Sequence, residues 1–176
     1  MAANYWLLKS EPDEFSITDL EARKTEPWTG VRNYLARNHL RAMALADLFF
    51  FYHSSCPVPG IAGIGKIAQT AIADPTQFDS ESDYFDAKSS TQAPRWSSVL
   101  TEFVAIAEPP ITLDQLRMQA GVLDDFALLH RGNRLSVLPV TPSQWQHICS
   151  LSTWRSAKQP RSASRSKREK IGVSKA

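Results

Sequence analysis

Strand-like runs separated by short helical segments constrain the fold of this chain more than any other feature. Apolar runs of this kind, bounded by turn residues, are typical of β-strands. Their order predicts an α+β protein, in which a mixed β-sheet curls into a small pseudo-barrel surrounded by short α-helices. The runs cover residues 4–10, 47–53, 61–72, 95–110 and 134–140, and the fourth is expected to end at its two prolines.

A glycine-rich stretch, "GIAGIG" at residues 60–65, is where a phosphate-binding loop would be sought. It lies inside a strand-like run, and no helix follows to offer its N-terminus to a phosphate. The chain therefore lacks the pattern of a doubly wound nucleotide-binding fold. Gly63 and Gly65 instead indicate a bend, a bulge or the close approach of another backbone.

Capping signals predict where the helices begin. Ser16 with Asp19, and Thr112 with Gln115, have the spacing of a capping box, and Pro142 stands in the first turn of a last helix. The segment between the third and fourth strands is acidic and reads as a long ordered loop. The helices are expected within residues 15–23, 33–46, 111–122, 123–130 and 141–151, and the loop over residues 74–94.

Composition favours one soluble intracellular domain. The 176 residues are 43% hydrophobic, with five Trp and eight Phe, which is enough for one core of ordinary size. No apolar run approaches the length of a membrane span, and the start lacks a secretory signal, so we expect no membrane partner. Cys56 and Cys149 have no metal or redox spacing, and we expect reduced thiols and no cofactor. A cytoplasmic monomer is the expectation, or a nuclear one in a eukaryote.

Charge divides the chain into a weakly acidic body and a basic end. Residues 155–176 hold eight Lys or Arg and one acid, which leaves the first 154 residues with 12 basic and 17 acidic side chains, a net charge of −5. We predict a domain over residues 1–153 and a disordered basic tail over residues 154–176, because the tail has almost no large apolar side chain. The tail is either a solubilising end or a non-specific arm that grips nucleic acid.

The stretch "WTGVRNYLARNHLRAM" at residues 28–43 combines side chains suited to a flat ligand. Gly30 lets a planar ring approach the backbone, Arg32 supplies a fork of donors, and the amide of Asn33 can pair with the edge of a heterocycle. Trp28 is either one wall of a slot or a plug at the end of the barrel core. Arg37 is expected to face solvent or a phosphate.

Two strand ends supply further candidates. Lys9 and Ser10 end the first strand-like run, and Tyr52, His53 and Ser54 end the second, where they can line the mouth of a pocket. An enzymatic alternative pairs His53 with Cys56 as base and nucleophile. No orienting carboxylate is identifiable for that pair, so a hydrogen-bonding wall is favoured.

Six stretches, in this order, are similar to the EVE-domain family over about residues 4–151. They are "YWLLKSEP", "WTGVRNYLARNHLRAM", "FFYHSSCPVPGIAGIGKI", "DPTQFD", "PRWSSVLTEFV" and "RLSVLPVT". The resemblance implies a PUA-like fold related to the YTH domain. It also implies a non-catalytic reader of modified bases in DNA or RNA, modified cytosines such as methylcytosine included.

The resemblance carries a set of ligand-binding positions over to this chain. Trp28 is the main candidate for an aromatic cage, with Tyr52 second. The resulting hypothesis has Trp28 as stacking wall, Arg32 and Asn33 as readers of the base edge and Arg37 near the phosphate. The alternatives are an enzyme that modifies nucleic acid through His53 and Cys56, and a protein-interaction scaffold. The positions are Lys9, Ser10, Trp28, Gly30, Val31, Arg32, Asn33, Arg37, Tyr52, His53 and Ser54.

Overall fold

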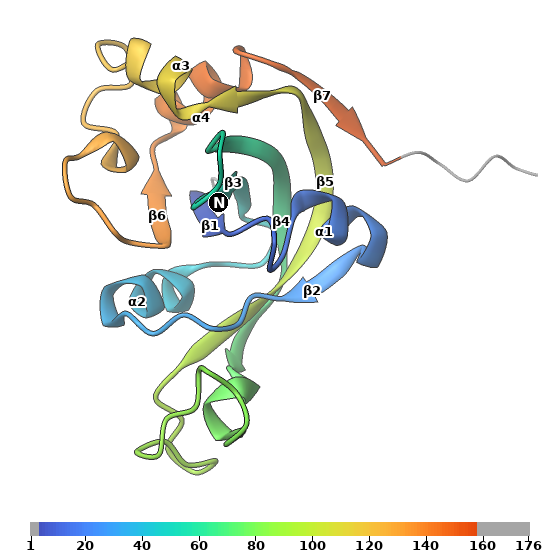
Figure 1. Ribbon diagram of the computed structural model, residues 1–176, viewed down its shortest axis with the longest axis vertical. Helices are drawn as coiled ribbons and strands as arrows, with labels where there is room; N and C mark the ends of the chain where they lie inside the picture. Colours follow the sequence, from blue (N-terminus) through green and yellow to red (C-terminus); the bar gives the residue numbers. More distant parts are fainter. Residues whose placement is uncertain (1–3, 158–176) are drawn as a thin grey trace, which may run out of the picture.

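The computed structural model describes residues 4–157, and within them one curled sheet carries four short α-helices (Figure 1). The α+β prediction is therefore confirmed. The helices are α1 (Ile17–Arg23), α2 (Tyr34–Ala42), α3 (Leu113–Met118) and α4 (Pro142–Cys149), with 3₁₀ turns at Pro75–Phe78 and Ala127–Leu129. The strands are β1 (Tyr5–Ser10), β2 (Thr25–Pro27), β3 (Leu48–His53), β4 (Gly60–Ala73), β5 (Ser97–Thr112), β6 (Val137–Val140) and β7 (Thr153–Ser156).

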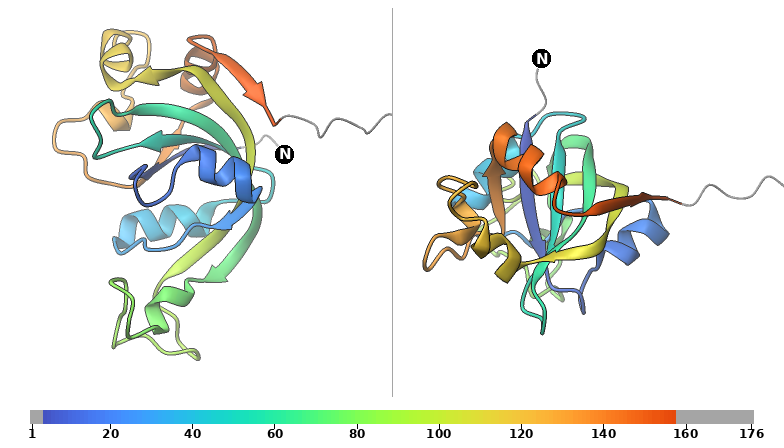
Figure 2. Two further views of the ribbon diagram at one scale, coloured as in Figure 1. Left: turned by 45° about the vertical axis from the view of Figure 1, so that its right-hand side comes forward. Right: turned by 90° about the horizontal axis from the view of Figure 1, so that it is seen from above.

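The sheet has the order β2-β5-β4-β3-β1-β6. Strand β7 lies off this path and pairs with residues 105–108 of β5, after the part of β5 that pairs with β2. Only the β1–β3 pair is parallel among the strands of residues 4–157, and the other pairs are antiparallel. The long strands β4 and β5 bend together along the length of the molecule, and α3 and α4 lie at one end of them (Figures 1 and 2). The sheet is thus both mixed and curled.

Apolar side chains fill the space on both faces of the central strands. Phe49 and Phe51 of β3 join one buried cluster, whereas Phe50 and Tyr52 join the other. Successive side chains of a strand point to opposite faces, so a continuous aromatic run indicates a strand that is buried on both. The first cluster also contains Trp28, which places the end of β2 against the barrel interior.

Gly63 and Gly65 lie where other groups come close to β4, as their positions in the sequence predict. A Cβ on Gly63 would stand 2.5 Å from the carbonyl oxygen of Ala105, and one on Gly65 would stand 2.2 Å from the ring of Phe49. The register of the β4–β5 ladder shifts at both glycines. The glycines therefore permit tight packing along the inner strand.

The helix starts agree with the capping signals, but several element ends do not. Ser16, Thr112 and Thr141 each cap a helix, and Asn33 is the N-cap of α2 rather than its first residue. α2 ends at Ala42, four residues earlier than expected. The segment over residues 123–130 forms only the 3₁₀ turn Ala127–Leu129.

Strand β5 continues through the two prolines that were expected to end it, and this prediction is wrong. Pairing with β4 jumps from Ile106 to Ile111, so Pro109 and Pro110 lie where β5 donates no hydrogen bond to β4. A proline needs such an unpaired position because it has no N–H group. The short strand β2 was also missed.

The boundary expected after residue 153 is too early. Trp154, Arg155 and Ser156 belong to β7, and the guanidinium group of Arg155 forms ion pairs with Glu21 at 2.7 Å and with Glu108 at 2.6 Å. The indole N–H of Trp154 donates to the carbonyl of Cys149. Glu21 and Glu108 are remote from Arg155 in sequence, so the composition of the tail could not reveal these ion pairs. The remaining tail, residues 158–176, lies outside the described residues.

Candidate functional site

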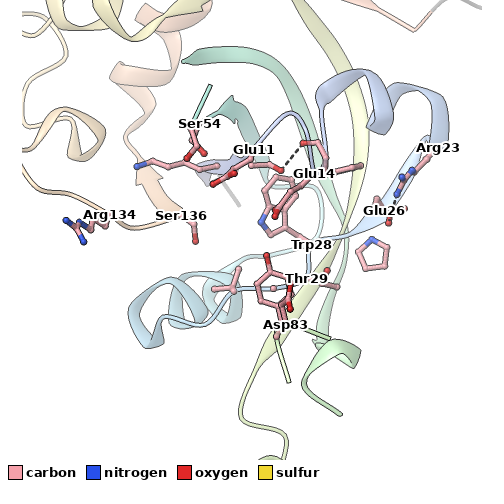
Figure 3. A pocket seen from close by; sticks show the side chains of 18 residues that line it. Glu11, Glu14, Arg23, Glu26, Trp28, Thr29, Ser54, Asp83, Arg134 and Ser136 are labelled. Carbon is pink, nitrogen blue, oxygen red and sulfur yellow. Dashed lines mark hydrogen bonds and ion pairs between the residues drawn. The ribbon is translucent and has the colours of Figure 1, made fainter. Parts of the chain in front are cut away.

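A cavity of about 680 Å³ opens beside the end of β2. Its walls come from the β1–α1 turn, the segment between β2 and α2, the loop after the 3₁₀ turn Pro75–Phe78, and the stretch that precedes β6. The labelled side chains show this arrangement: Glu11 and Glu14 lie on one side of Trp28, and Asp83 lies on the other (Figure 3). Its volume lies within the range of about 300–1,000 Å³ that is typical of small-ligand sites.

Trp28 lines the cavity, but most of its side chain is buried in the hydrophobic core. Only 6% of the residue is exposed, and the ring packs edge-on against Phe49 and Phe51 with centroid distances of 6.0 and 5.2 Å. Its backbone N–H donates to the carbonyl of Val99. The two interpretations of Trp28 therefore coexist, because the indole closes the barrel core and forms a part of the cavity lining.

Tyr84 supplies the larger exposed aromatic surface. The residue is 36% exposed and lines the cavity, and its ring lies so close to Gly30 that a Cβ there would stand 2.9 Å from it. Gly30 has a φ of 81°, a conformation that favours glycine. Burial, followed by the carboxylates of Glu14, Asp83 and Glu11, raises the pKa of the Tyr84 phenol, so the hydroxyl stays protonated.

Charged side chains around the opening make it more acidic than basic. Among the lining residues, Arg23 and Glu26 pair with each other at 2.9 Å. The remaining carboxylates are those that raise the pKa of Tyr84, and none of them forms an ion pair within residues 4–157. The unpaired lining groups are the acids Glu11, Glu14 and Asp83 and the bases Lys9 and Arg134.

Small polar groups from two strand ends complete the lining. Lys9 is half-buried, and this burial lowers the pKa of its ammonium group. The hydroxyl of Ser10 donates to the carbonyl of Phe15 and so fixes the β1–α1 turn. Ser54 comes from the end of β3, which runs parallel to β1.

Arg32 does not line the cavity, because its guanidinium group is held behind the wall. It donates to the carboxylate of Asp74 at 2.8 Å, to the hydroxyl of Thr76 at 2.9 Å and to the carbonyl of Tyr84. Asp74 is fully buried, and its carboxylate also accepts the backbone N–H of Gly30 at 2.8 Å. Arg32 and Asp74 therefore hold the Gly30 and Tyr84 segments together.

The charge of Asp74 is maintained by these donors. Burial alone would raise the pKa of its carboxyl group, but hydrogen bonds from Arg32, Thr76 and Gly30 outweigh burial and hold the pKa below its ordinary value. The second carboxylate oxygen accepts both the N–H and the hydroxyl of Thr76. Every donor in this network thus has a defined acceptor.

Four other predicted positions also have local partners outside the cavity lining. The side chain of Asn33 caps α2 by accepting from the N–H groups of Leu35 and Ala36, and Arg37 donates to the carbonyl of Arg95 at 2.9 Å. Tyr52 is buried in the second core cluster. The ring nitrogen of His53 accepts the N–H of Ile17 at the start of α1.

Six of the eleven predicted positions therefore meet at the cavity, and five do not. The residues that sequence reasoning missed come from the β1–α1 turn and from the two long loops. Tyr84 lies in the segment over residues 74–94, which the sequence indicates only as a long acidic loop. The six are Lys9, Ser10, Trp28, Gly30, Val31 and Ser54, and the missed ones include Glu11, Glu14, Phe15, Asp83, Tyr84, Arg134 and Ser136.

No group of three or more His, Cys, Asp or Glu side chains in the described part of the chain is arranged to hold a metal ion. Within that part, no helix has both the length and the apolar composition needed to cross a membrane.

Comparison with known proteins adds independent findings. The family model described as EVE domain matches residues 4–151. Thymocyte nuclear protein 1 of Mus musculus is 42% identical over 167 residues, which cover 85% of this chain and 74% of the mouse protein. A solved structure from Pseudomonas syringae is 54% identical, with a TM-score of 0.81, and the match covers 84% of this chain and 98% of that one.

A further solved structure is the human thymocyte nuclear protein 1 in complex with DNA that contains 5-methylcytosine. It is 39% identical to this chain, with a TM-score of 0.79, and the match covers 85% of this chain and 97% of the human one.

Proposed function

The chain belongs to the EVE-domain family, whose fold is PUA-like, and on that premise we propose that it is a non-catalytic module that binds a modified nucleobase in nucleic acid. The observation that carries the proposal is the cavity beside Trp28 and Tyr84, which joins aromatic surface to hydrogen-bonding groups. Because the human relative was crystallised with DNA that contains 5-methylcytosine, modified cytosine is the first ligand to test.

The lining supports a base with hydrogen-bond donors on its edge. The carboxylates of Glu11, Glu14 and Asp83 can accept from the exocyclic amine of cytosine, as acidic side chains do in base recognition. The ring of Tyr84 has the exposed surface on which a base can stack, and Trp28 contributes the apolar end of the lining. We therefore revise the roles given to Arg32 and Asn33, because both side chains are already engaged elsewhere.

Energetics favour a base that is already unpaired. Stacking on an aromatic ring contributes about 1–3 kcal/mol, whereas extruding a base from a duplex costs a few kcal/mol. The methyl group itself contributes about 0.8 kcal/mol when buried, which is a preference of about fourfold. We expect a modest preference for the modified base and weaker binding to duplex than to single strands.

The proposal is tested by titrating the full chain with a short single-stranded oligonucleotide that carries one 5-methylcytosine, and with its unmodified counterpart. We expect the modified strand to bind about fourfold more tightly, and neither strand to change in mass after incubation. Equal affinity for the two strands would contradict recognition of the modification. A covalent change in the strand that disappears in Cys56→Ala would favour the enzymatic alternative.

Neither alternative is favoured by a specific observation. In the candidate catalytic pair of His53 and Cys56, the Nε2 atom of His53 accepts the N–H of Ile17, so this nitrogen is not free to take a proton from Cys56.

For location, we propose the nucleus if the source is a eukaryote and the cytoplasm otherwise. The name of the animal relatives, thymocyte nuclear protein 1, supports the nuclear half of this proposal.

A further inference from the structure

The opening of the cavity is a poor place for a phosphate backbone. Glu11, Glu14 and Asp83 outnumber Lys9 and Arg134 around it, and the first 154 residues carry a net charge of −5. A polyanion that inserts one base there must be attracted by a local concentration of positive charge elsewhere.

Such a concentration lies next to the cavity, on the face formed by α2 and the start of β5. We call it the arginine surface, and it consists of Tyr34, Arg37, Arg41 and Arg95. The guanidinium carbon of Arg37 lies 4.8 Å from the centroid of the Tyr34 ring, and that of Arg95 lies 5.9 Å from it. Arg41 donates to the hydroxyl of Ser97 at 2.7 Å.

Two of these arginines have no countercharge. Arg95 forms an ion pair with Asp86 at 3.2 Å, but Arg37 and Arg41 contact no carboxylate within residues 4–157. Burial, followed by the like charge of Arg41, lowers the pKa of the Arg37 guanidinium. Holding cations side by side is unfavourable without an anion, so the arrangement is one that a bound anion would stabilise.

An exposed aromatic ring accompanies the charges. Tyr34 is 50% exposed, although it stacks on Trp96 with a centroid distance of 5.0 Å and an interplanar angle of 20°. The stack on Trp96 and the hydrogen bond from Arg95 to the Tyr34 hydroxyl keep the ring in place at the surface. An aromatic ring beside a row of cations is the combination by which proteins hold single strands.

The arginine surface lies close to the cavity. The guanidinium carbon of Arg32 lies 5.5 Å from the ring centroid of Tyr84, which lines the cavity, and 5.4 Å from that of Trp96. Arg37 lies over the same Trp96 ring at 5.8 Å. Arg32 and Arg37 therefore flank one buried ring, and a strand that leaves the cavity past Tyr84 can reach Tyr34 and Arg37. In Figure 2 (left), α2 lies between the β1–α1 segment and the loop that follows β4, and both of these segments contribute residues to the cavity.

We propose that the arginine surface binds the phosphodiester backbone of the nucleotides that flank the recognised base, with Arg37 and Arg41 as the phosphate ligands and Tyr34 as a platform for a neighbouring base. This inference rests on the proposed function, because it takes the cavity as the site of the recognised base. Each site binds a different part of the nucleic acid, because the cavity binds the recognised base and the arginine surface binds the flanking backbone.

The test compares two ligands on one variant. Arg37→Gln/Arg41→Gln is titrated with free 5-methyl-2′-deoxycytidine and with the single-stranded oligonucleotide that carries the same base, over a range of salt concentrations. Each phosphate contact contributes about 0.7 to the slope of log K against log salt for single strands. We expect the slope to fall by about 1.4 and the affinity for the oligonucleotide to fall roughly tenfold at 0.15 M salt. The affinity for the nucleoside should not change.

Two control variants make the result specific. Arg117→Gln/Arg131→Gln removes the same charge from exposed positions in and after α3, and should alter neither slope nor affinity by a comparable amount. Arg37→Lys/Arg41→Lys keeps the charge and should retain most of the slope, which separates loss of charge from loss of structure.

The inference is overturned if Arg37→Gln/Arg41→Gln keeps the slope and affinity of the wild type for the oligonucleotide. It is also overturned if nucleoside and oligonucleotide affinities fall together, or if the α3 control loses as much. Failure of the proposed function looks different, because the wild-type chain would then bind neither the nucleoside nor the modified strand in preference to the unmodified one.

Discussion

Asp74→Asn is expected to lower the free energy of unfolding by about 3–5 kcal/mol, because it leaves the guanidinium group of Arg32 partly buried without a countercharge. Asp74 is fully buried and accepts four hydrogen bonds, from Arg32, Gly30 and two groups of Thr76. An amide of the same size keeps only one oxygen acceptor and turns an N–H group toward donors. The loss therefore includes the cost of unsatisfied buried groups.

Thermal unfolding measures this prediction, and a decrease in Tm of roughly 6–20 °C is expected for a domain of this size. The folded pKa of Asp74 is lowered, so its contribution is present at neutral pH and is lost as the pH falls below the ordinary value of 3.8. The free energy of unfolding of Asp74→Asn should therefore fall less than that of the wild type as the pH is lowered below 3.8.

Asp114→Asn serves as the control, because it removes a surface pair with Arg117 and should change the free energy of unfolding by less than about 1 kcal/mol. Equal Tm values for the two variants would contradict the role of Asp74.

Tyr84→Ala is expected to weaken binding of the modified oligonucleotide by roughly five- to 150-fold, which corresponds to about 1–3 kcal/mol of lost stacking. The fold should persist, because the carbonyl oxygen of residue 84 remains available to Arg32. Fluorescence anisotropy of a labelled strand measures the change in affinity.

The neighbouring residue provides a matched control for Tyr84. Phe85 is 44% exposed on the same loop but does not line the cavity, so Phe85→Ala should leave the affinity nearly unchanged. Tyr84→Leu keeps an apolar side chain without a π-face and should lose most of what Tyr84→Ala loses. Equal affinities for Tyr84→Ala and Phe85→Ala would show that stacking on this ring does not occur.

Local signals in the sequence predict the frame of this protein well. Capping residues such as Ser16 and Thr112 act on their own helix, and the alternation of Phe49 to Tyr52 reflects the two faces of one strand. Each depends on neighbours within a few residues, which the sequence displays directly. The α+β class follows from the order of these elements.

The site is less predictable because its contacts join segments that are distant in sequence. Arg32 was expected to read a base, yet Asp74, which lies 42 residues further along the chain, holds its guanidinium group. Tyr84 stands in a polar loop, and it lines the cavity through contacts with distant residues, among them the hydrogen bond from Arg32 to its carbonyl. Residue type indicates what each side chain can bind, and the tertiary contacts decide which side chains face the cavity.

Protein-observed NMR with free 5-methyl-2′-deoxycytidine tests most directly whether the base enters the cavity beside Trp28 and Tyr84. We expect the largest changes of chemical shift at the indole N–H of Trp28 and the backbone amides of Gly30 and Tyr84, all of which belong to lining residues. Changes confined to another surface, such as the groove beside Tyr5 and Pro139, with these three signals unmoved, would contradict the account.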